Sequence, residues 1–305
     1  MLREFRREIR LMGSAFEFIV VDSGDRADQL LDTAIGEVQR IENLLTEFSD
    51  LSQTALLNRS AGSAPVAVDT EVFELLRRCV EISRLTQGAF DITAGVLKKL
   101  YNFKGGPPTW PDARTLEQTL QKTGYQHIRL LKGNRAYLSK PGMHIGFGAV
   151  GKGYAADCVK VILQKKGVQS AVINASGDLT AWGKRADGTP WKVGIAAPNN
   201  PTNVVLWLPV DGISVATSGD YEQFFERNGI RYTHNLDPKT GCPVRGVKSV
   251  TVVSPSAELS DALATAVFVM GPEVGSHFIE QLPRTHCVVI DADNKLHVSK
   301  NLAII

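Results

Sequence analysis

Helical and strand-like patterns follow one another along this chain without a regular alternation, and this irregular order limits the fold more than any other feature. Apolar residues recur at helical spacing through residues 25–48, and a second helical stripe follows Asp69, which can cap it. Residues 127–138 instead read as a hairpin around Lys132-Gly133-Asn134. Because a doubly wound α/β fold needs a steady succession of strand, helix and strand, the order predicts an α+β fold.

The same patterns predict further elements over the rest of the chain. They are strands within residues 12–21, 171–173 and 247–253, and helices at 112–122, 152–166, 260–270 and 272–281. The sequence Gly105-Gly106-Pro107-Pro108 interrupts these patterns and reads as a surface loop. Since no repeat or low-complexity linker divides the chain, we expect one domain over residues 1–305 with a loop excursion near 103–111.

The composition argues against several classes of protein. The net charge is only +2 over 305 residues, and Lys and Arg are interspersed with acids, which argues against a nucleic-acid surface. No apolar run approaches the ~18 residues of a membrane span. The cysteines form no CxxC pair, so neither a zinc site nor a disulfide framework is indicated; they are Cys79, Cys158, Cys242 and Cys287.

The first residues bear on the cellular compartment. Residues 1–8 carry the basic charge of a signal peptide but lack its apolar segment. The sequence is therefore compatible with a cytoplasmic protein, or with a periplasmic or membrane-associated protein whose signal segment has been removed.

A glycine-rich segment in the middle of the chain matches two nucleotide-binding patterns. Residues 146–151 satisfy GxGxxG, but no run of parallel strands is predicted after them, which weakens a Rossmann interpretation. Residues 146–152 satisfy GxxxxGK, but the next residue is Gly153, so the hydroxyl that binds magnesium in a P-loop is absent. Two interpretations stay open: an anion site made by a helix N-terminus and Lys152, or a tight turn that binds nothing.

Asp261 and Thr265 stand four residues apart in a predicted helix, so both side chains lie on one face. Two hard oxygens at this spacing can bind magnesium or calcium, with phosphate and water oxygens completing the shell. The alternative is that Asp261 is an acid of the first helical turn, favoured by the helix dipole, with Ser260 as the N-cap. The spacing alone does not separate these two interpretations.

His234 lies beside Thr233 and shortly before the turn Asp237-Pro238. A histidine can take a proton from a hydroxyl nucleophile near neutral pH. The alternative is a structural residue that only makes hydrogen bonds. Two polar loops, residues 174–178 and 217–221, have the same ambiguity, because each can order a ligand or simply turn the chain.

The order of these elements resembles the ApbE family of FAD:protein FMN transferases over nearly the whole chain. Seven elements carry the resemblance: Met12-Gly13-Ser14, residues 88–95 (GAFDITAG), residues 148–154 (GAVGKGY), Ser176-Gly177-Asp178, residues 216–221 (ATSGDY), residues 234–241 (HNLDPKTG) and residues 260–265 (SDALAT). Seven elements in the family's order are far more specific than any one of them.

The resemblance implies an α+β fold similar to the T-fold, with mixed, largely antiparallel sheets and packed helices. It implies an enzyme that cleaves the pyrophosphate of FAD, attaches FMN through a phosphoester to a Ser or Thr of a target protein, and releases AMP. Some members hydrolyse FAD to FMN and AMP instead. The oligomeric state stays open, a homodimer included.

The resemblance also implies roles for particular residues. Magnesium is expected at Asp261, Thr265 and the backbone carbonyl of Gly151. Lys152 is expected to add positive potential, and His234 to orient or deprotonate the acceptor hydroxyl. Contacts to FAD are expected from Met12, Asp91, Thr93, Asp178 and Ser218.

The chain departs from the family pattern at two positions. Gly146 stands where the family carries an aspartate, and Ser176 stands where it carries a glycine. Two other classes of protein remain as alternatives. A nicotinamide-dependent oxidoreductase is favoured only by the GxGxxG match, and a flavin-binding carrier would keep the pocket but need no metal.

Overall fold

The computed structural model describes residues 1–103, 107–198 and 200–303. Its centre is an eight-stranded sheet in the order β1-β2-β6-β7-β10-β13-β14-β15, and every neighbouring pair is antiparallel. The strands are β1 (Arg3–Leu11), β2 (Ser14–Asp22), β6 (Ala171–Ala175), β7 (Asp178–Trp182), β10 (Ile213–Gly219), β13 (Val247–Ser254), β14 (His286–Asp291) and β15 (Leu296–Val298). The α+β class and the antiparallel character expected from the sequence are confirmed.

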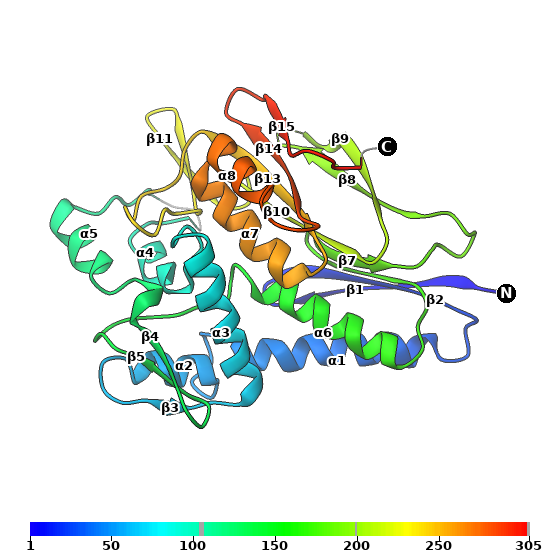
Figure 1. The fold of residues 1–305 in the computed structure, drawn as a ribbon, viewed down its shortest axis with the longest axis horizontal. Coiled ribbons are helices and arrows are strands. Elements are labelled where there is room, and N and C mark those ends of the chain that lie inside the picture. Colours follow the sequence, from blue (N-terminus) through cyan, green and yellow to red (C-terminus); the bar gives the residue numbers. More distant parts are fainter. Residues whose placement is uncertain (104–106, 199, 304–305) are drawn as a thin grey trace.

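Helices cover one face of this sheet (Figure 1). They are α1 (Ala27–Leu45), α6 (Gly151–Lys165), α7 (Ala257–Met270) and α8 (Pro272–Ile279). In α1 the buried residues Leu30, Leu31, Ala34, Val38, Ile41 and Leu45 recur at three- and four-residue spacing, which places them on one stripe. In β2 the buried side chains alternate instead, at Phe16, Phe18 and Val20. These two periodicities bring the helix stripe and the strand face into one core.

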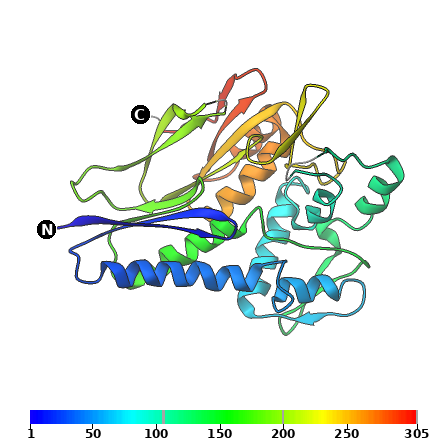
Figure 2. The same cartoon turned by 180° about the vertical axis from the view of Figure 1, so that it is seen from behind.

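The opposite face of the sheet is covered by a two-stranded ribbon, which Figure 2 shows from behind. The ribbon consists of β8 (Trp191–Ala197) and β9 (Asn200–Val210). Its buried residues Trp191, Ile195 and Leu208 form a second apolar cluster with Leu179 and Val215 of the sheet. The sheet is therefore buried on both faces over much of its length.

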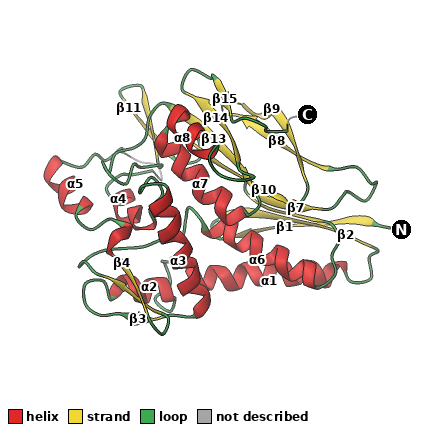
Figure 3. Ribbon diagram, in the orientation of Figure 1, coloured by secondary structure: helices red, strands yellow, loops and turns green. Residues whose placement is uncertain are grey.

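A smaller helical lobe adjoins one end of the sheet (Figure 3). Its helices are α2 (Gln53–Arg59), α3 (Thr70–Leu85), η1 (Ile92–Ala94), α4 (Gly95–Lys98), α5 (Ala113–Leu120) and η2 (Tyr125–His127). A three-stranded sheet of β3 (Val66–Ala67), β5 (Arg135–Leu138) and β4 (Ile128–Leu131) completes it, and the hairpin β11 (Phe224–Arg227)–β12 (Ile230–Thr233) stands nearby. The expected hairpin around Lys132-Gly133-Asn134 is confirmed as β4–β5.

Two differences from the sequence-based expectations have identifiable causes, and one expectation falls partly outside the described residues. Strand β1 was not expected, because its exposed Arg and Glu residues mask the strand pattern. Helix α7 begins before Ser260: its N-cap is Ser256, whose Oγ accepts a hydrogen bond from Leu259 N at 3.2 Å. The loop expected near 103–111 includes residues 104–106, which lie outside the described residues.

Two general properties of the described residues bear on function. None of their helices combines the length and apolar character that crossing a membrane requires. All four cysteines carry free thiols, and Cys79 and Cys287 are buried.

Candidate active site

A polar pocket lies between the helix-covered sheet and the helical lobe. Several segments far apart in sequence line it: Glu47 after α1, residues 89–92, 94–95 and 98, residues 146, 148–149 and 152, Asp178 at the start of β7, residues 217–218 and 222, residues 234–236 and 238, and Asp261 with Thr265 from α7. Seven of the ten residues expected to form the site line this pocket: Asp91, Lys152, Asp178, Ser218, His234, Asp261 and Thr265.

Lys152 lies in the first turn of α6 and forms an ion pair with the buried Asp178 at the start of β7. The second oxygen of Asp178, Oδ1, accepts a hydrogen bond from Thr217 N at 3.3 Å. Burial alone lowers the pKa of Lys152, but Asp178 and Asp261 outweigh it and hold that pKa above its ordinary value. Lys152 therefore stays a cation inside the pocket.

Asp261 and Thr265, the residues expected to bind a metal, line the same pocket. Asp261 Oδ2 accepts a hydrogen bond from Gly153 N at 3.2 Å, which ties α7 to the start of α6. The Oγ1 atom of Thr265 lies 3.5 Å from Ser218 Oγ. Burial and the neighbouring Asp178 raise the pKa of Asp261 to about 8. An excess of buried acid beside hydroxyl oxygens is a donor set that suits a hard divalent cation.

His234 directly follows β12, and its ring is largely buried. Its Nδ1 is 3.2 Å from the carbonyl oxygen of Gln223, so this nitrogen carries the proton and donates it. The other nitrogen, Nε2, lies 4.0 Å from a carboxylate oxygen of Glu222. Burial, then the positive charge of Lys98, lowers the pKa of His234 to about 4. The imidazole is therefore neutral near pH 7, with Nε2 free to accept a proton.

The side chains of Asp91 and Thr93 make hydrogen bonds with each other and with backbone N–H groups of the helical lobe, so they leave few polar atoms free for a ligand. Asp91 Oδ1 accepts hydrogen bonds from Thr93 N at 2.8 Å and from Thr93 Oγ1 at 2.7 Å, and Oδ2 accepts one from Tyr125 N at 2.8 Å. Thr93 Oγ1 in turn accepts a hydrogen bond from Gly124 N at 2.7 Å, and its side chain is buried. Asp91 lines the pocket, whereas Thr93 lies behind it.

Gly151 is the first residue of α6, and the side chain of Met12 packs against it. Met12 and Gly13 form the two-residue turn between β1 and β2, both with positive φ, at 50° and 75°. A Cβ atom on Gly151 would lie 3.4 Å from the Cε atom of Met12. Neither residue is among those that line the pocket in the described chain, so the expected FAD contact of Met12 and metal contact of Gly151 stay predictions.

Three charged residues of the pocket were missed from the sequence. They are Glu47, Lys98 and Glu222. Glu222 directly follows the 216–221 element, and Lys98 lies one helical turn after Gly95, so proximity to known motifs was a usable signal for both. Glu47 follows α1 and has no motif beside it, and only the fold brings it to the pocket.

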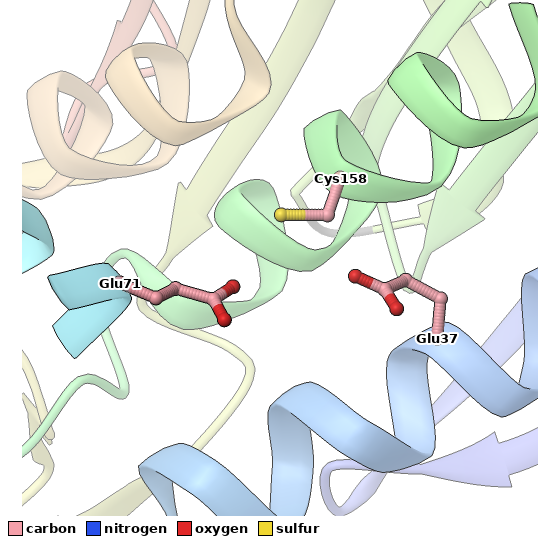
Figure 4. A group of neighbouring side chains, drawn as sticks. All are labelled: Glu37, Glu71 and Cys158. Carbon is pink, nitrogen blue, oxygen red and sulfur yellow. The ribbon is translucent and has the colours of Figure 1, made fainter. Parts of the chain in front are cut away.

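A second group of possible metal ligands lies away from this pocket. Glu37, Glu71 and Cys158 place their ligand atoms within 4.8 Å of one another, and Figure 4 shows Glu37 from α1, Glu71 from α3 and Cys158 from α6 pointing toward one another. Arg40 donates to both carboxylates, at 2.7 Å to Glu37 Oε1 and 2.7 Å to Glu71 Oε2. Tyr154 Oη also donates to Glu71, at 2.6 Å. Arg40 and Tyr154 already bind these carboxylates, so the cluster is a structural ion-pair network.

The fold and the pocket define an α+β protein that gathers acids, two lysines and a histidine where a helical lobe meets an antiparallel sheet. The sequence model of the ApbE family matches residues 12–289 of this chain. The chain therefore belongs to the ApbE family. A FAD:protein FMN transferase of Treponema pallidum is 31% identical over 319 residues, covering 99% of this chain and 88% of that protein. One of Klebsiella pneumoniae is 34% identical over 247 residues, covering 80% and 76%. The crystal structure of the ApbE protein of Thermotoga maritima superposes with a TM-score of 0.90 at 29% identity, covering 98% of this chain and 97% of that one.

Proposed function

We propose that this chain is a magnesium-dependent FAD:protein FMN transferase that attaches FMN to a Ser or Thr of a target protein and releases AMP. One observation carries the proposal: Lys152, Asp178, His234, Asp261 and Thr265 meet in a single pocket of an ApbE-family fold. The names of the related proteins supply the reaction class, and the pocket supplies groups that suit it.

Asp261 and Thr265, with a carbonyl at Gly151, are the residues that would hold magnesium. When bound there, the ion would neutralise charge on the diphosphate oxygens. Lys152 adds a fixed cation on the same side of the pocket, held in place by Asp178. The turn at 146–151 brings the helix N-terminus and its backbone N–H groups to the pocket, where an anion is favoured.

In the transfer step the oxygen of the acceptor hydroxyl forms a bond to the phosphorus on the FMN side of FAD. The bond from that phosphorus to the bridging oxygen breaks, and AMP leaves with the bridging oxygen. The hydroxyl proton goes to Nε2 of His234, which is unprotonated because Nδ1 donates to Gln223. Glu222, 4.0 Å from Nε2, stabilises the imidazolium that results.

The test uses the purified protein with FAD, with and without magnesium, and measures AMP. Metal-dependent AMP release is expected, and its absence would leave a flavin-binding carrier. Adding a candidate target protein and examining flavin fluorescence on a denaturing gel separates transfer from hydrolysis. If AMP forms while all the FMN stays free whichever acceptor is supplied, the chain is a FAD pyrophosphatase.

A nicotinamide-dependent oxidoreductase is the remaining alternative. The 146–151 segment leads into α6, but the sheet beside it is antiparallel throughout, which is not a Rossmann sheet. Calorimetric titration with FAD and with NAD decides between them. Micromolar binding of NAD with no binding of FAD would overturn the transferase proposal.

A further inference from the structure

The pocket contains a lysine that the mechanism above does not use. Lys98 is the last residue of α4, and Gly95, which also lines the pocket, lies one helical turn before it. Val96 and Leu97 are buried in the apolar cluster of the helical lobe. The short helix therefore keeps its apolar side chains in the core and presents Lys98 to the cavity.

The ammonium group of Lys98 has no hydrogen bond or ion pair with any residue that the structure describes. Lys98 is exposed to solvent and also lines the pocket. Glu222, Glu47 and Lys152 act on it only through space, and desolvation lowers the pKa of its amine. An ammonium group that is partly desolvated and has no partner gains free energy when an anion binds beside it.

Lys98 and Lys152 differ in how much charge they can offer to a ligand. Lys152 is already paired with Asp178, whereas Lys98 keeps its charge unpaired among the described residues. Lys98 also lies close enough to His234 to lower the pKa of that ring. The unpaired cation is therefore near the group proposed to receive the acceptor proton.

We propose that Lys98 is a second cationic contact for FAD, binding a diphosphate oxygen from the helical-lobe wall of the pocket while Lys152 acts from the α6 wall. This inference rests on the proposed function. The diphosphate is the only anionic part of FAD, so an unpaired ammonium in this pocket has one complementary group to bind. Lys98 lies outside both sequence elements, residues 260–265 and 148–154, from which Asp261, Thr265 and Lys152 were predicted.

The experiment compares Lys98→Met, Lys98→Arg and Lys99→Met with the wild-type protein. Lys99 is the matched control, because it is the adjacent exposed lysine and acts on Glu47 through space, but does not line the pocket. Dissociation constants are measured for FAD and for riboflavin, which has no phosphate, with magnesium and with a chelator. Melting temperatures show whether each variant is folded.

Lys98→Met is expected to weaken FAD binding about tenfold or more while riboflavin binding stays within about twofold. Lys98→Arg should restore most of the FAD affinity, and Lys99→Met should change neither ligand. Equal FAD affinity of wild type and folded Lys98→Met overturns this inference alone. Equal loss of FAD and riboflavin also overturns it, because that indicates a general change in the pocket. A wild-type protein that binds no FAD overturns the proposed function and this inference together.

Discussion

The backbone N–H of Gly153 donates a hydrogen bond to Asp261 Oδ2 at 3.2 Å, and this contact joins α6 to α7 at the floor of the pocket. The two helices approach closely there, because a Cβ atom on Gly153 would lie 2.2 Å from the carbonyl oxygen of Ala257. The carboxylate of Asp261 is thus positioned by a backbone contact that only glycine permits. The position of Asp261 in the 260–265 element therefore depends on a glycine of the 148–154 element.

The first prediction concerns this close approach. Gly153→Ala should destabilise the protein by about 1–3 kcal/mol, because the new Cβ meets backbone that cannot rotate away. Gly36→Ala is the matched control: Gly36 lies exposed within α1 with nothing within 4 Å of its Cβ position, so it should stabilise by about 0.5–1 kcal/mol. Urea unfolding measures both. Equal stabilities of the two variants would contradict the geometry at Gly153.

The second prediction separates the role of the buried Asp261 in α7 from that of Asp157, the residue of α6 that caps α7. Asp261→Asn should lower metal-dependent AMP release by about 100-fold or more while the protein stays folded, since the proposed site loses its charged ligand. Asp157 is the control, because its carboxylate caps α7 through Ala257 N at 3.0 Å and Glu258 N at 2.9 Å. Asp157→Asn should lower the melting temperature and leave the magnesium dependence of activity unchanged. Unchanged AMP release by Asp261→Asn at limiting magnesium would remove Asp261 from the metal site.

The third prediction concerns proton transfer at His234. His234→Ala should slow transfer about 10²- to 10⁴-fold with little change in FAD affinity, as expected for a lost general base. Because the pKa of His234 is lowered to about 4, the ring is unprotonated above that pH, and the wild-type rate should fall only as pH drops toward 4. A pH–rate profile from pH 4 to 8, with single-turnover transfer, checks this. An inflection near pH 6.5 that His234→Ala abolishes would contradict the lowered pKa.

The same shift has a consequence for stability. The pKa of His234 in the folded protein lies below its ordinary value of 6.5, so the unfolded chain binds the proton first as pH falls. The folded state therefore loses stability as pH falls from about 6.5 toward 4, and His234→Gln should lose less. Melting temperatures of the two proteins across this pH range test the sign. A wild-type curve no steeper than that of His234→Gln would show that the ring is not held neutral.

Much of the fold follows from local patterns in the sequence. Helix α1 was predicted because its buried residues lie on one stripe, and the β4–β5 hairpin because a three-residue turn separates two apolar runs. Strand β1 was not, because it is stabilised by its pairing with β2 along the whole hairpin from the turn at Met12-Gly13, and not by an apolar stripe of its own. Local periodicity reports burial, and an edge strand with exposed arginines carries little of it.

The residues of the candidate site also divide into those that local sequence elements predicted and those that only the fold brings to the pocket. The motif elements supplied Lys152, Asp178 and Asp261, since each belongs to a segment whose order along the chain is specific. Glu47 could not be assigned in this way, because only the fold brings the segment after α1 to the pocket beside the 146–151 turn. Thr93 shows the opposite case, a motif residue that does not line the pocket. Its hydroxyl donates a hydrogen bond to Asp91 and accepts one from Gly124 N.

The last prediction concerns Gly146, where the chain lacks the acid of the family pattern. A Cβ atom at Gly146 would lie 3.3 Å from Glu47 Oε1, so Glu47 occupies the space that a side chain there would need. Glu47 is held by a hydrogen bond with His144, which lowers the pKa of its carboxyl group and keeps it ionised. His144 Nε2 is also 3.3 Å from Asn58 Nδ2.

Gly146→Asp should therefore lower stability by about 1–2 kcal/mol, because it adds a second carboxylate in tight contact with the first. Glu47→Ala removes that contact, so the double variant should be more stable than the sum of the two single changes predicts, by about 0.5–3 kcal/mol. Gly148→Ala is the control, since nothing lies within 4 Å of its Cβ position. Unfolding free energies of the four proteins of the cycle decide the matter. Strict additivity would show that Glu47 does not occupy the place of the missing acid, whereas coupling would show that this chain supplies a carboxylate to the pocket from the end of α1.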